Sequence, residues 1–237
     1  MISVCMPTYN GERYIQSQMD SILKQLGEKD EVIISDDSST DRTIEIIRSY
    51  NDPRIKIFYG SYHSPIFNLE NAMAHAKGDY IFLSDQDDEW MPNKVKMTME
   101  YLSKYDCVVS DAIVVDGDDN VISESFFEQR NSRTGKVHNL MRNCYLGCCM
   151  AFTSKIKDIS LPFPKDIPMH DIWIGAIVEF FGSGYFLPEK LIKYRRHGGN
   201  ASPTAEKSNY SIKGKIGFRY SIIKNIKQRK RMMSKVG

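Results

Sequence analysis

Three carboxylates occur within four residues in the sequence Asp85-Gln86-Asp87-Asp88, which Ser84 separates from the apolar run 80–83. Carboxylates this close repel one another unless a cation lies among them. Their oxygens suit Mn²⁺ or Mg²⁺, and these ions complete their coordination shells with water and substrate phosphates. The pattern predicts that Asp85, Asp87 and Asp88 hold such an ion. A solvated acidic turn remains the alternative.

A second acidic pair, Asp36-Asp37, follows the apolar run 31–35. A carboxylate at this position can accept the ring N–H of a uracil- or thymine-type base, and Tyr9 offers an aromatic face. Such a pair is equally typical of the turn that precedes and caps a helix. Base recognition and a structural turn therefore both remain open for Asp36 and Asp37.

Alternating strands and helices are expected to position these side chains. Apolar runs predict strands at residues 2–6, 31–35, 55–59 and 80–83. Helical spacing predicts helices at 15–26, through Ile44 and Ile47, and at 68–77. Ser39 or Thr40 is expected to cap the second of these. The order is typical of a parallel sheet with helices on both faces, which binds ligands beyond the carboxyl ends of its strands. The polar loops are therefore expected to meet at one sheet edge.

The second half of the chain is less regular. It is expected to contain a strand at 107–110 ending at Asp111, a hairpin about the turn 116–119, an apolar segment at 145–152, a helix at 172–181 and an extended segment at 185–194. Asp171 directly precedes the helix, so it can serve as the N-cap.

Three motifs in this order resemble those of family 2 glycosyltransferases of the GT-A fold. They are Pro7-Thr8-Tyr9-Asn10, Asp36-Asp37-Ser38-Ser39-Thr40-Asp41 and the DXD-type Asp85-Gln86-Asp87-Asp88. The extended run 82–90 is similar to the rhamnosyltransferase-like branch. The resemblance implies a Rossmann-like α/β fold with a mostly parallel central sheet flanked by helices and a C-terminal amphipathic helical tail. It implies a catalytic domain at 1–206, with a nucleotide-sugar-binding half (1–110) and an acceptor half (111–206).

The resemblance also implies roles for individual residues. The residues expected to bind the nucleotide-sugar are Pro7, Thr8, Tyr9, Asn10, Asp36, Asp37, Asn71, Asp85 and Arg195. Those expected to hold Mn²⁺ or Mg²⁺ are Asp85, Asp87, Asp88 and His197. Helix packing is the simpler interpretation of Asn71, and unpaired surface cations are the alternative for Arg195 and His197.

Asp171 matches the position of the general base in this family. It is expected to take the proton from the acceptor hydroxyl, with a pKa near or modestly above that of a free carboxyl group. Attack opposite the departing diphosphate would invert the anomeric centre. A helix cap is the alternative role, and a cap can also act as a base. Gly147 resembles a small residue on the acceptor side that lets the sugar approach the backbone.

The implied function is transfer of a sugar from a UDP- or dTDP-sugar to an acceptor hydroxyl, in the assembly of a bacterial cell-surface polysaccharide. A nucleotidyltransferase would be expected to carry a Gly-rich phosphate loop after its first strand, and the segment 7–11 is not one. A catalytically inactive nucleotide-sugar-binding module is a third possibility, which Asp171 and the acidic cluster argue against.

Charge divides the chain into an acidic body and a basic tail. Residues 207–237 hold ten of the 32 Lys and Arg residues and none of the 30 Asp and Glu residues, so the tail carries +10 and the body −8. Six apolar residues of the tail fall near one helical face: Ile212, Ile216, Tyr220, Ile223, Ile226 and Met233. A basic amphipathic helix predicts peripheral membrane contact, which suits a lipid-linked acceptor. Packing on the body remains the alternative, and the acidic body argues against nucleic acid.

Length and cysteine content bound the remaining possibilities. A chain of 237 residues with 41% hydrophobic residues suits one substantial α/β domain. The N-terminus lacks the basic region of an export signal, and no run of 18 apolar residues occurs. The five cysteines are expected to be reduced thiols. These features predict a cytoplasmic protein, one that can also lie peripherally at the membrane's inner face.

Overall fold

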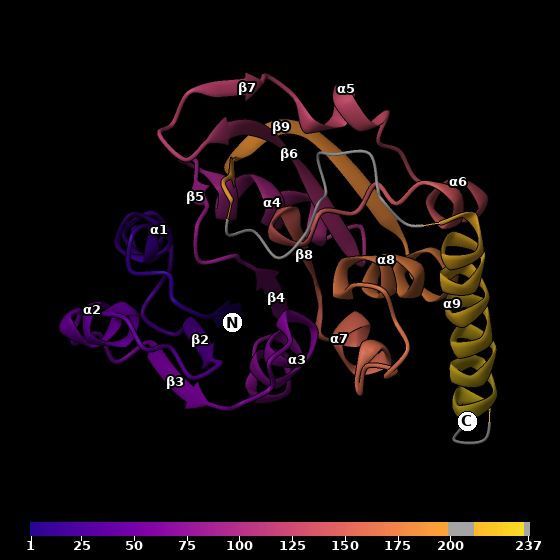
Figure 1. The fold of residues 1–237 in the computed structure, drawn as a ribbon, viewed down its shortest axis with the longest axis horizontal. Helices are drawn as coiled ribbons and strands as arrows, with labels where there is room; N and C mark the ends of the chain where they lie inside the picture. Colours follow the sequence, from indigo (N-terminus) through magenta and orange to yellow (C-terminus); the bar gives the residue numbers. More distant parts are fainter. Residues whose placement is uncertain (199–210, 235–237) are drawn as a thin grey trace.

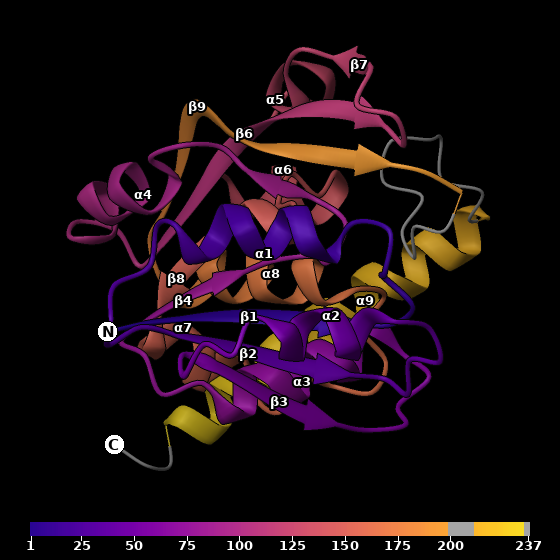
Figure 2. The same ribbon diagram turned by 90° about the vertical axis from the view of Figure 1, so that its left-hand side faces the viewer.

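The computed structural model describes residues 1–198 and 211–234. Within this part, nine strands form one curled sheet in the order β3-β2-β1-β4-β8-β6-β9-β5, with β7 paired to β6 (Figures 1 and 2). Helices cover both faces of the sheet. The predicted α/β class is confirmed.

The four strands of the first half are parallel, as predicted. They are β1 (Ile2–Thr8), β2 (Glu31–Asp36), β3 (Ile55–Tyr59) and β4 (Tyr80–Leu83). β1 lies between β2 and β4, and β2 pairs with β3. Thr8 is in register with Asp36, so the first two strands end side by side. This places the loops that follow them at one edge of the sheet.

Three helices connect these strands: α1 (Ile15–Leu23), α2 (Thr43–Ser49) and α3 (Pro65–His75). α1 and α2 lie on one side of the sheet and α3 on the other (Figure 1). The predicted cap of α2 is wrong, because its N-cap residue is Arg42. Ser39 and Thr40 instead bind Asn10: its backbone N–H donates to Ser39 Oγ, and its side-chain oxygen accepts from the Thr40 N–H.

The second half adds a mixed sheet. β8 (Met150–Thr153) runs antiparallel to β4 and to β6 (Cys107–Asp116), and β9 (Gly184–Arg196) runs parallel to β6. β5 (Glu89–Trp90) and β7 (Val121–Ser123) pair antiparallel with β9 and β6. The predicted end of a strand at Asp111 is wrong. β6 continues through Asp111 because the buried Asp111 carboxylate accepts hydrogen bonds from Ser125, Ala112 and Phe127.

Shorter helices surround this half of the sheet. They are α4 (Lys94–Leu102), α5 (Phe126–Arg130), α6 (Lys136–Met141), the 3₁₀ turn η1 (Gly147–Cys149), α7 (Ser154–Ser160) and α8 (His170–Phe181). α8 begins two residues before its predicted start. Trp173 anchors it, since its ring is buried and its Nε1–H donates to the carbonyl of Ser160.

The C-terminal helix α9 (Ile212–Met233) packs on the body along one face. Ile222 and Ile226 are buried there, and Asn225 donates to the carboxylate of Asp166. The predicted single apolar face is therefore wrong in part, because Ile226 faces the body while Tyr220 is 70% exposed. The side chain of Ile212 and the predicted domain boundary at 206–207 lie outside the described residues.

Two further expectations concern membranes and thiols. Among the described residues, no helix combines the length and apolarity needed to cross a membrane. All five cysteines are free and buried, as expected for reduced thiols.

Candidate active site

A cavity of about 450 Å³ opens at the carboxyl ends of β1, β2 and β4, beside the start of α8. Seven of the predicted site residues line it: Pro7, Thr8, Tyr9, Asp37, Asp85, Asp87 and Asp171. The predicted site residues that do not line it are Asn10, Asp36, Asn71, Asp88, Arg195 and His197. The structure thus brings residues of four separate elements around one space.

Asp36 and Asn10 hold the loop after β1 in place without lining the cavity. The buried Asp36 carboxylate accepts hydrogen bonds from Thr8 Oγ1 at 2.8 Å and from the N–H and hydroxyl of Ser39. Asn10 is held by the same segment. Asn71, on α3, donates to Ser35 Oγ at 2.8 Å. Asp36 and Asn10 thus hold the end of β1 and the loop after it, and Asn71 ties α3 to β2.

Asp37 lines the cavity and orders a segment that sequence reasoning missed. Its carboxylate accepts the backbone N–H groups of Tyr62, His63 and Ser64. The side of the cavity formed by His63 and Ser64 therefore depends on Asp37. Tyr9 stands 56% exposed at the rim, which leaves its ring accessible to a planar ligand.

Gln86 ties the acidic loop to the first loop. Its side-chain oxygen accepts from the backbone N–H of Tyr9, and its nitrogen donates to the Tyr9 carbonyl, both at 2.9 Å. Sequence reasoning included Gln86 in the acidic motif without assigning it a role. Its position between two aspartates was the available signal.

Burial and mutual repulsion raise the pKa values of the acidic loop. The pKa of Asp85 rises to about 7, first through burial and then through the charges of Asp87 and Asp171. Burial, Asp87 and Asp85 raise the pKa of Asp88 well above its ordinary value. Asp88 Oδ1 accepts the Arg195 N–H, and the Cys148 thiol beside the buried Asp88 carboxylate partly opposes this rise. This charge density is what a cation relieves.

The pair Asp87 and His197 fits a divalent cation. Asp87 Oδ2 lies 2.8 Å from His197 Nε2. Neighbouring ligands in an octahedral Mg²⁺ shell, with bonds of about 2.1 Å, stand about 3 Å apart. Another group, Asp85, Asp88 and Cys148, has its ligand atoms within 4.8 Å of one another. The Cys148 thiol of this group is a soft ligand that suits Mg²⁺ or Mn²⁺ poorly. We therefore favour Asp87 and His197 as the candidate ligands of such a cation.

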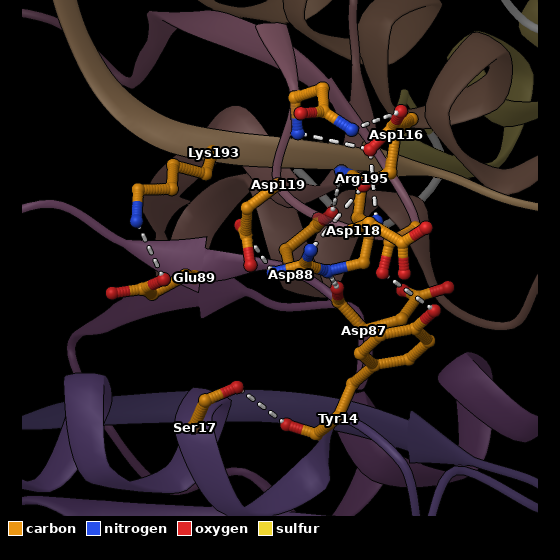
Figure 3. Close-up of polar contacts among 12 residues, drawn as sticks. Tyr14, Ser17, Asp87, Asp88, Glu89, Asp116, Asp118, Asp119, Lys193 and Arg195 are labelled. Carbon is orange, nitrogen blue, oxygen red and sulfur yellow. Dashed lines mark hydrogen bonds and ion pairs between the residues drawn. The ribbon is translucent and has the colours of Figure 1, made fainter.

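Arg195 braces the acidic loop (Figure 3). Its Nε donates to the Asp87 carbonyl at 2.9 Å, and its guanidinium pairs with Asp119 at 3.0 Å and lies over the Tyr14 ring. Only 3% of Arg195 is exposed. The alternative of an unpaired surface cation is therefore wrong for Arg195, which joins the acidic loop to the β6–β7 turn.

Asp171, the second residue of α8, has the properties of a base. It lines the cavity and is 7% exposed. The Ile172 N–H donates to Oδ1 at 2.7 Å and Asn143 donates to Oδ2 at 3.3 Å. Burial raises its pKa to about 7, against the opposing effects of Ile172, Arg130 and Asn143. The N-cap residue is Met169, so the cap alternative is wrong.

The wall beside Asp171 leaves little space. A Cβ on Gly147 would lie 3.0 Å from His170 Nε2, and both residues line the cavity. Burial lowers the pKa of His170 to about 4, so its ring is neutral near pH 7. A neutral imidazole and a bare backbone form the surface next to the candidate base.

Comparison with known proteins identifies the family. The family model described as "Glycosyl transferase family 2" matches residues 3–158. The chain belongs to glycosyl transferase family 2. The matched range contains the three motifs from which the resemblance was inferred, so the family assignment is confirmed.

Named relatives of this family 2 glycosyltransferase cover most of its length. TuaG of Bacillus subtilis (strain 168), whose name assigns it provisionally to teichuronic acid biosynthesis, is 27% identical over 82% of this chain and 79% of its own. WfgD of Escherichia coli, named as a UDP-Glc:alpha-D-GlcNAc-diphosphoundecaprenol beta-1,3-glucosyltransferase, is 27% identical over 69% and 64%.

A solved structure confirms the GT-A fold. S. aureus TarS 1–349 in complex with UDP-GlcNAc superposes with a TM-score of 0.68 at 21% identity. The match covers 84% of this chain and 59% of TarS 1–349, so the chain spans about three fifths of that protein.

Proposed function

We propose that this chain is an inverting, metal-dependent glycosyltransferase that moves a sugar from a UDP- or dTDP-sugar to an acceptor hydroxyl. The observation that carries the proposal is the convergence of Asp85, Asp87 and Asp171 on one cavity of about 450 Å³. Cation ligands and a base with a pKa of about 7 are the two parts that the reaction needs.

Asp87 and His197 would hold Mn²⁺ or Mg²⁺, with Asp85 and Asp88 supplying negative charge around it. The ion would neutralise the charge that develops on the departing nucleoside diphosphate. Arg195 keeps these ligands in place through Asp87 and Asp119. The crowding of the buried Asp85 and Asp88 carboxylates beside Asp87 supports this role.

Asp171 would accept the proton of the acceptor hydroxyl as that oxygen attacks the anomeric carbon. Asn143 and the Ile172 N–H orient the carboxylate. Attack on the face opposite the leaving group inverts the anomeric centre. Gly147 and the neutral ring of His170 would form the surface that the acceptor sugar contacts beside the base.

The nucleoside would lie against Tyr9 and the segment that Asp37 orders. UDP-Glc in the name of WfgD and UDP-GlcNAc in the TarS structure support a uridine donor. The run 82–90 supports a rhamnosyltransferase-like enzyme that uses dTDP-rhamnose. Comparing UDP-hexoses with dTDP-rhamnose as donors decides between them.

The acceptor would be a saccharide, free or lipid-linked, in the assembly of a bacterial cell-surface polysaccharide. The diphosphoundecaprenol acceptor in the name of WfgD and the polymer in the name of TuaG support this setting. We place the enzyme in the cytoplasm, in peripheral contact with the membrane through its basic tail, with residues 1–110 serving the donor and 111–206 the acceptor.

One experiment tests this function. The chain is incubated with UDP- or dTDP-sugars, with and without Mn²⁺, while thermal stability and donor hydrolysis are followed. We expect stabilisation that needs both nucleotide and metal, and slow release of nucleoside diphosphate. Preference for a triphosphate with release of pyrophosphate would indicate a nucleotidyltransferase. Binding without any turnover would indicate an inactive binding module.

A further inference from the structure

Helices α6 and α9 expose apolar side chains that the proposed chemistry does not use. The exposed fractions are 77% for Val137 and 60% for Met141 on α6, and 60% for Ile216 and 70% for Tyr220 on α9. We call these four residues, together with Ile223 on α9, the α6–α9 surface. Contiguous patches of exposed apolar side chains mark interaction sites.

The two helices are held together. Arg219 of α9 donates hydrogen bonds to the carbonyls of Leu140 and Met141 on α6, at 3.2 and 3.0 Å. Figure 1 shows α6 beside the N-terminal end of α9. The N-terminal half of α9 and the end of α6 therefore lie next to each other.

Docking of α9 on the body leaves its outer face uncovered. Ser221, Ile222, Asn225 and Ile226 face the body and are buried. Positions 216, 220, 223 and 227 follow one another at spacings of four, three and four, so they share the opposite face of the helix. All four are exposed. The helix thus presents an apolar N-terminal half and a cationic C-terminal half to the outside.

The charge of α9 has one sign. Residues 212–233 contain eight Lys and Arg residues and no Asp or Glu. Lys227, Lys230 and Arg231 are exposed, and no acidic side chain of the described residues forms an ion pair with them. Apolar groups flanked by cations suit a bilayer with anionic headgroups. A second copy of this chain would set like charges against each other, which disfavours self-association.

The surface lies close to the candidate base. Met141 belongs to the α6–α9 surface, and Asn143, two residues later, donates to the carboxylate of Asp171. Two residues of chain span at most about 7 Å. An acceptor held at the α6–α9 surface is therefore near the part of the cavity where its hydroxyl is needed.

We propose that the α6–α9 surface docks on the anionic headgroups of a membrane, with the apolar side chains of both helices entering the interface. Lys227, Lys230 and Arg231 contact the headgroups. A lipid-linked acceptor then reaches Asp171 from the bilayer side. The docking stands on the surface alone, and only the delivery of the acceptor rests on the proposed function.

Vesicle co-sedimentation of the full chain tests the docking. Vesicles contain phosphatidylcholine alone or with about one third phosphatidylglycerol. We expect binding to the anionic vesicles that weakens with salt. The double variant V137S/Y220S should reduce vesicle binding at least tenfold. Each of the single substitutions K227Q, K230Q and R231Q should reduce it about fivefold. The matched control changes Val121 and Ile122 on β7, which are 54% and 57% exposed, to Ser and should bind like wild type.

Two outcomes overturn the docking: no binding to anionic vesicles at low salt, or equal binding by the control and by V137S/Y220S. A dimer in sedimentation velocity that V137S/Y220S abolishes, without vesicle binding, assigns the surface to self-association instead. Donor hydrolysis in the absence of vesicles separates this test from the enzyme proposal. Vesicle binding without donor hydrolysis contradicts only the enzymatic reaction. Donor hydrolysis without vesicle binding contradicts the docking and the proposed membrane contact of the tail, and leaves the enzymatic reaction standing.

Discussion

Replacing Asp171 with Asn is expected to abolish transfer and to stabilise the protein above neutral pH. The carboxylate is 7% exposed, and burial raises its pKa from 3.8 to about 7. The folded state therefore binds this proton more tightly than the unfolded chain does. Stability linked to Asp171 is complete below pH 3.8 and is lost as the pH rises towards about 7. Above that pH the ionised carboxylate lowers the free energy of unfolding by a constant amount.

The size of this loss of stability follows from the shift in the pKa of Asp171. A difference of about three pKa units corresponds to about 4 kcal/mol at pH 8, and relaxation around the charge reduces this to about 2–4 kcal/mol. At pH 5 less than half of this loss in the free energy of unfolding has developed. The amide of an asparagine at this position carries no charge, so D171N should be more stable than wild type at pH 8 by this amount. For a chain of this size that raises Tm by about 5–10 °C.

Thermal and urea unfolding at pH 5 and pH 8 measure this difference. The matched control is D158N, because the Asp158 side chain is 70% exposed and its replacement should change stability by less than about 0.5 kcal/mol. Transfer by D171N should fall by about 10²–10⁴-fold while donor affinity is retained. The reasoning fails if D171N and D158N unfold alike at pH 8, or if D171N still transfers sugar.

Three other predictions concern the metal, the acceptor side and pH. Separate replacement of Asp87 and His197 by Ala should weaken Mn²⁺ binding at least tenfold, measured by titration in the presence of UDP, and unchanged affinity in both variants would remove this pair as ligands. G147A places a Cβ 3.0 Å from His170 and should lower kcat/KM for the acceptor about tenfold while sparing donor hydrolysis; an equal loss in both assays would contradict an acceptor-side role. The transfer rate should fall about tenfold per pH unit below about pH 7 as Asp171 is protonated, and a flat profile down to pH 5 would exclude it as the titrating base.

The part of the cavity at the ends of β1, β2 and β4 was predictable because parallel strands place their ends together. Thr8 ends β1, Asp37 and Asp85 follow the neighbouring strands β2 and β4, and all three residues line the cavity. The alternation of strands and helices was sufficient to predict this edge. The motifs then indicated the chemistry, and the family match confirms the class of enzyme.

Other parts of the site depend on contacts that the sequence pattern does not contain. Asp36 and Asp37 are adjacent aspartates, but Asp36 turns back to Thr8 and Asp37 faces the cavity. His63 enters the cavity wall in a left-handed conformation, at φ 49°, because its N–H binds Asp37 across 26 positions of sequence. Arg195 was predicted to bind the donor, and its burial beneath the acidic loop depends on the β6–β7 turn.

For the basic tail, too, the sequence pattern predicts the helix but not its contacts with the body. Helical spacing predicted a helix with apolar and basic residues, and α9 is that helix. Which of its apolar residues face the body depends on the hydrogen bonds that Ser221 and Asn225 donate to Asp166, in the loop before α8. Ile222 and Ile226 became buried through this docking, and Ile216 and Tyr220 did not.

The most direct test of the central claim is an anomalous difference map from a crystal grown with Mn²⁺ and UDP. The account predicts a manganese peak within about 2.2 Å of Asp87 Oδ2 and His197 Nε2 that also contacts the diphosphate. A peak held by Cys148 and Asp88, or UDP bound away from both Asp87 and Asp171, would contradict it.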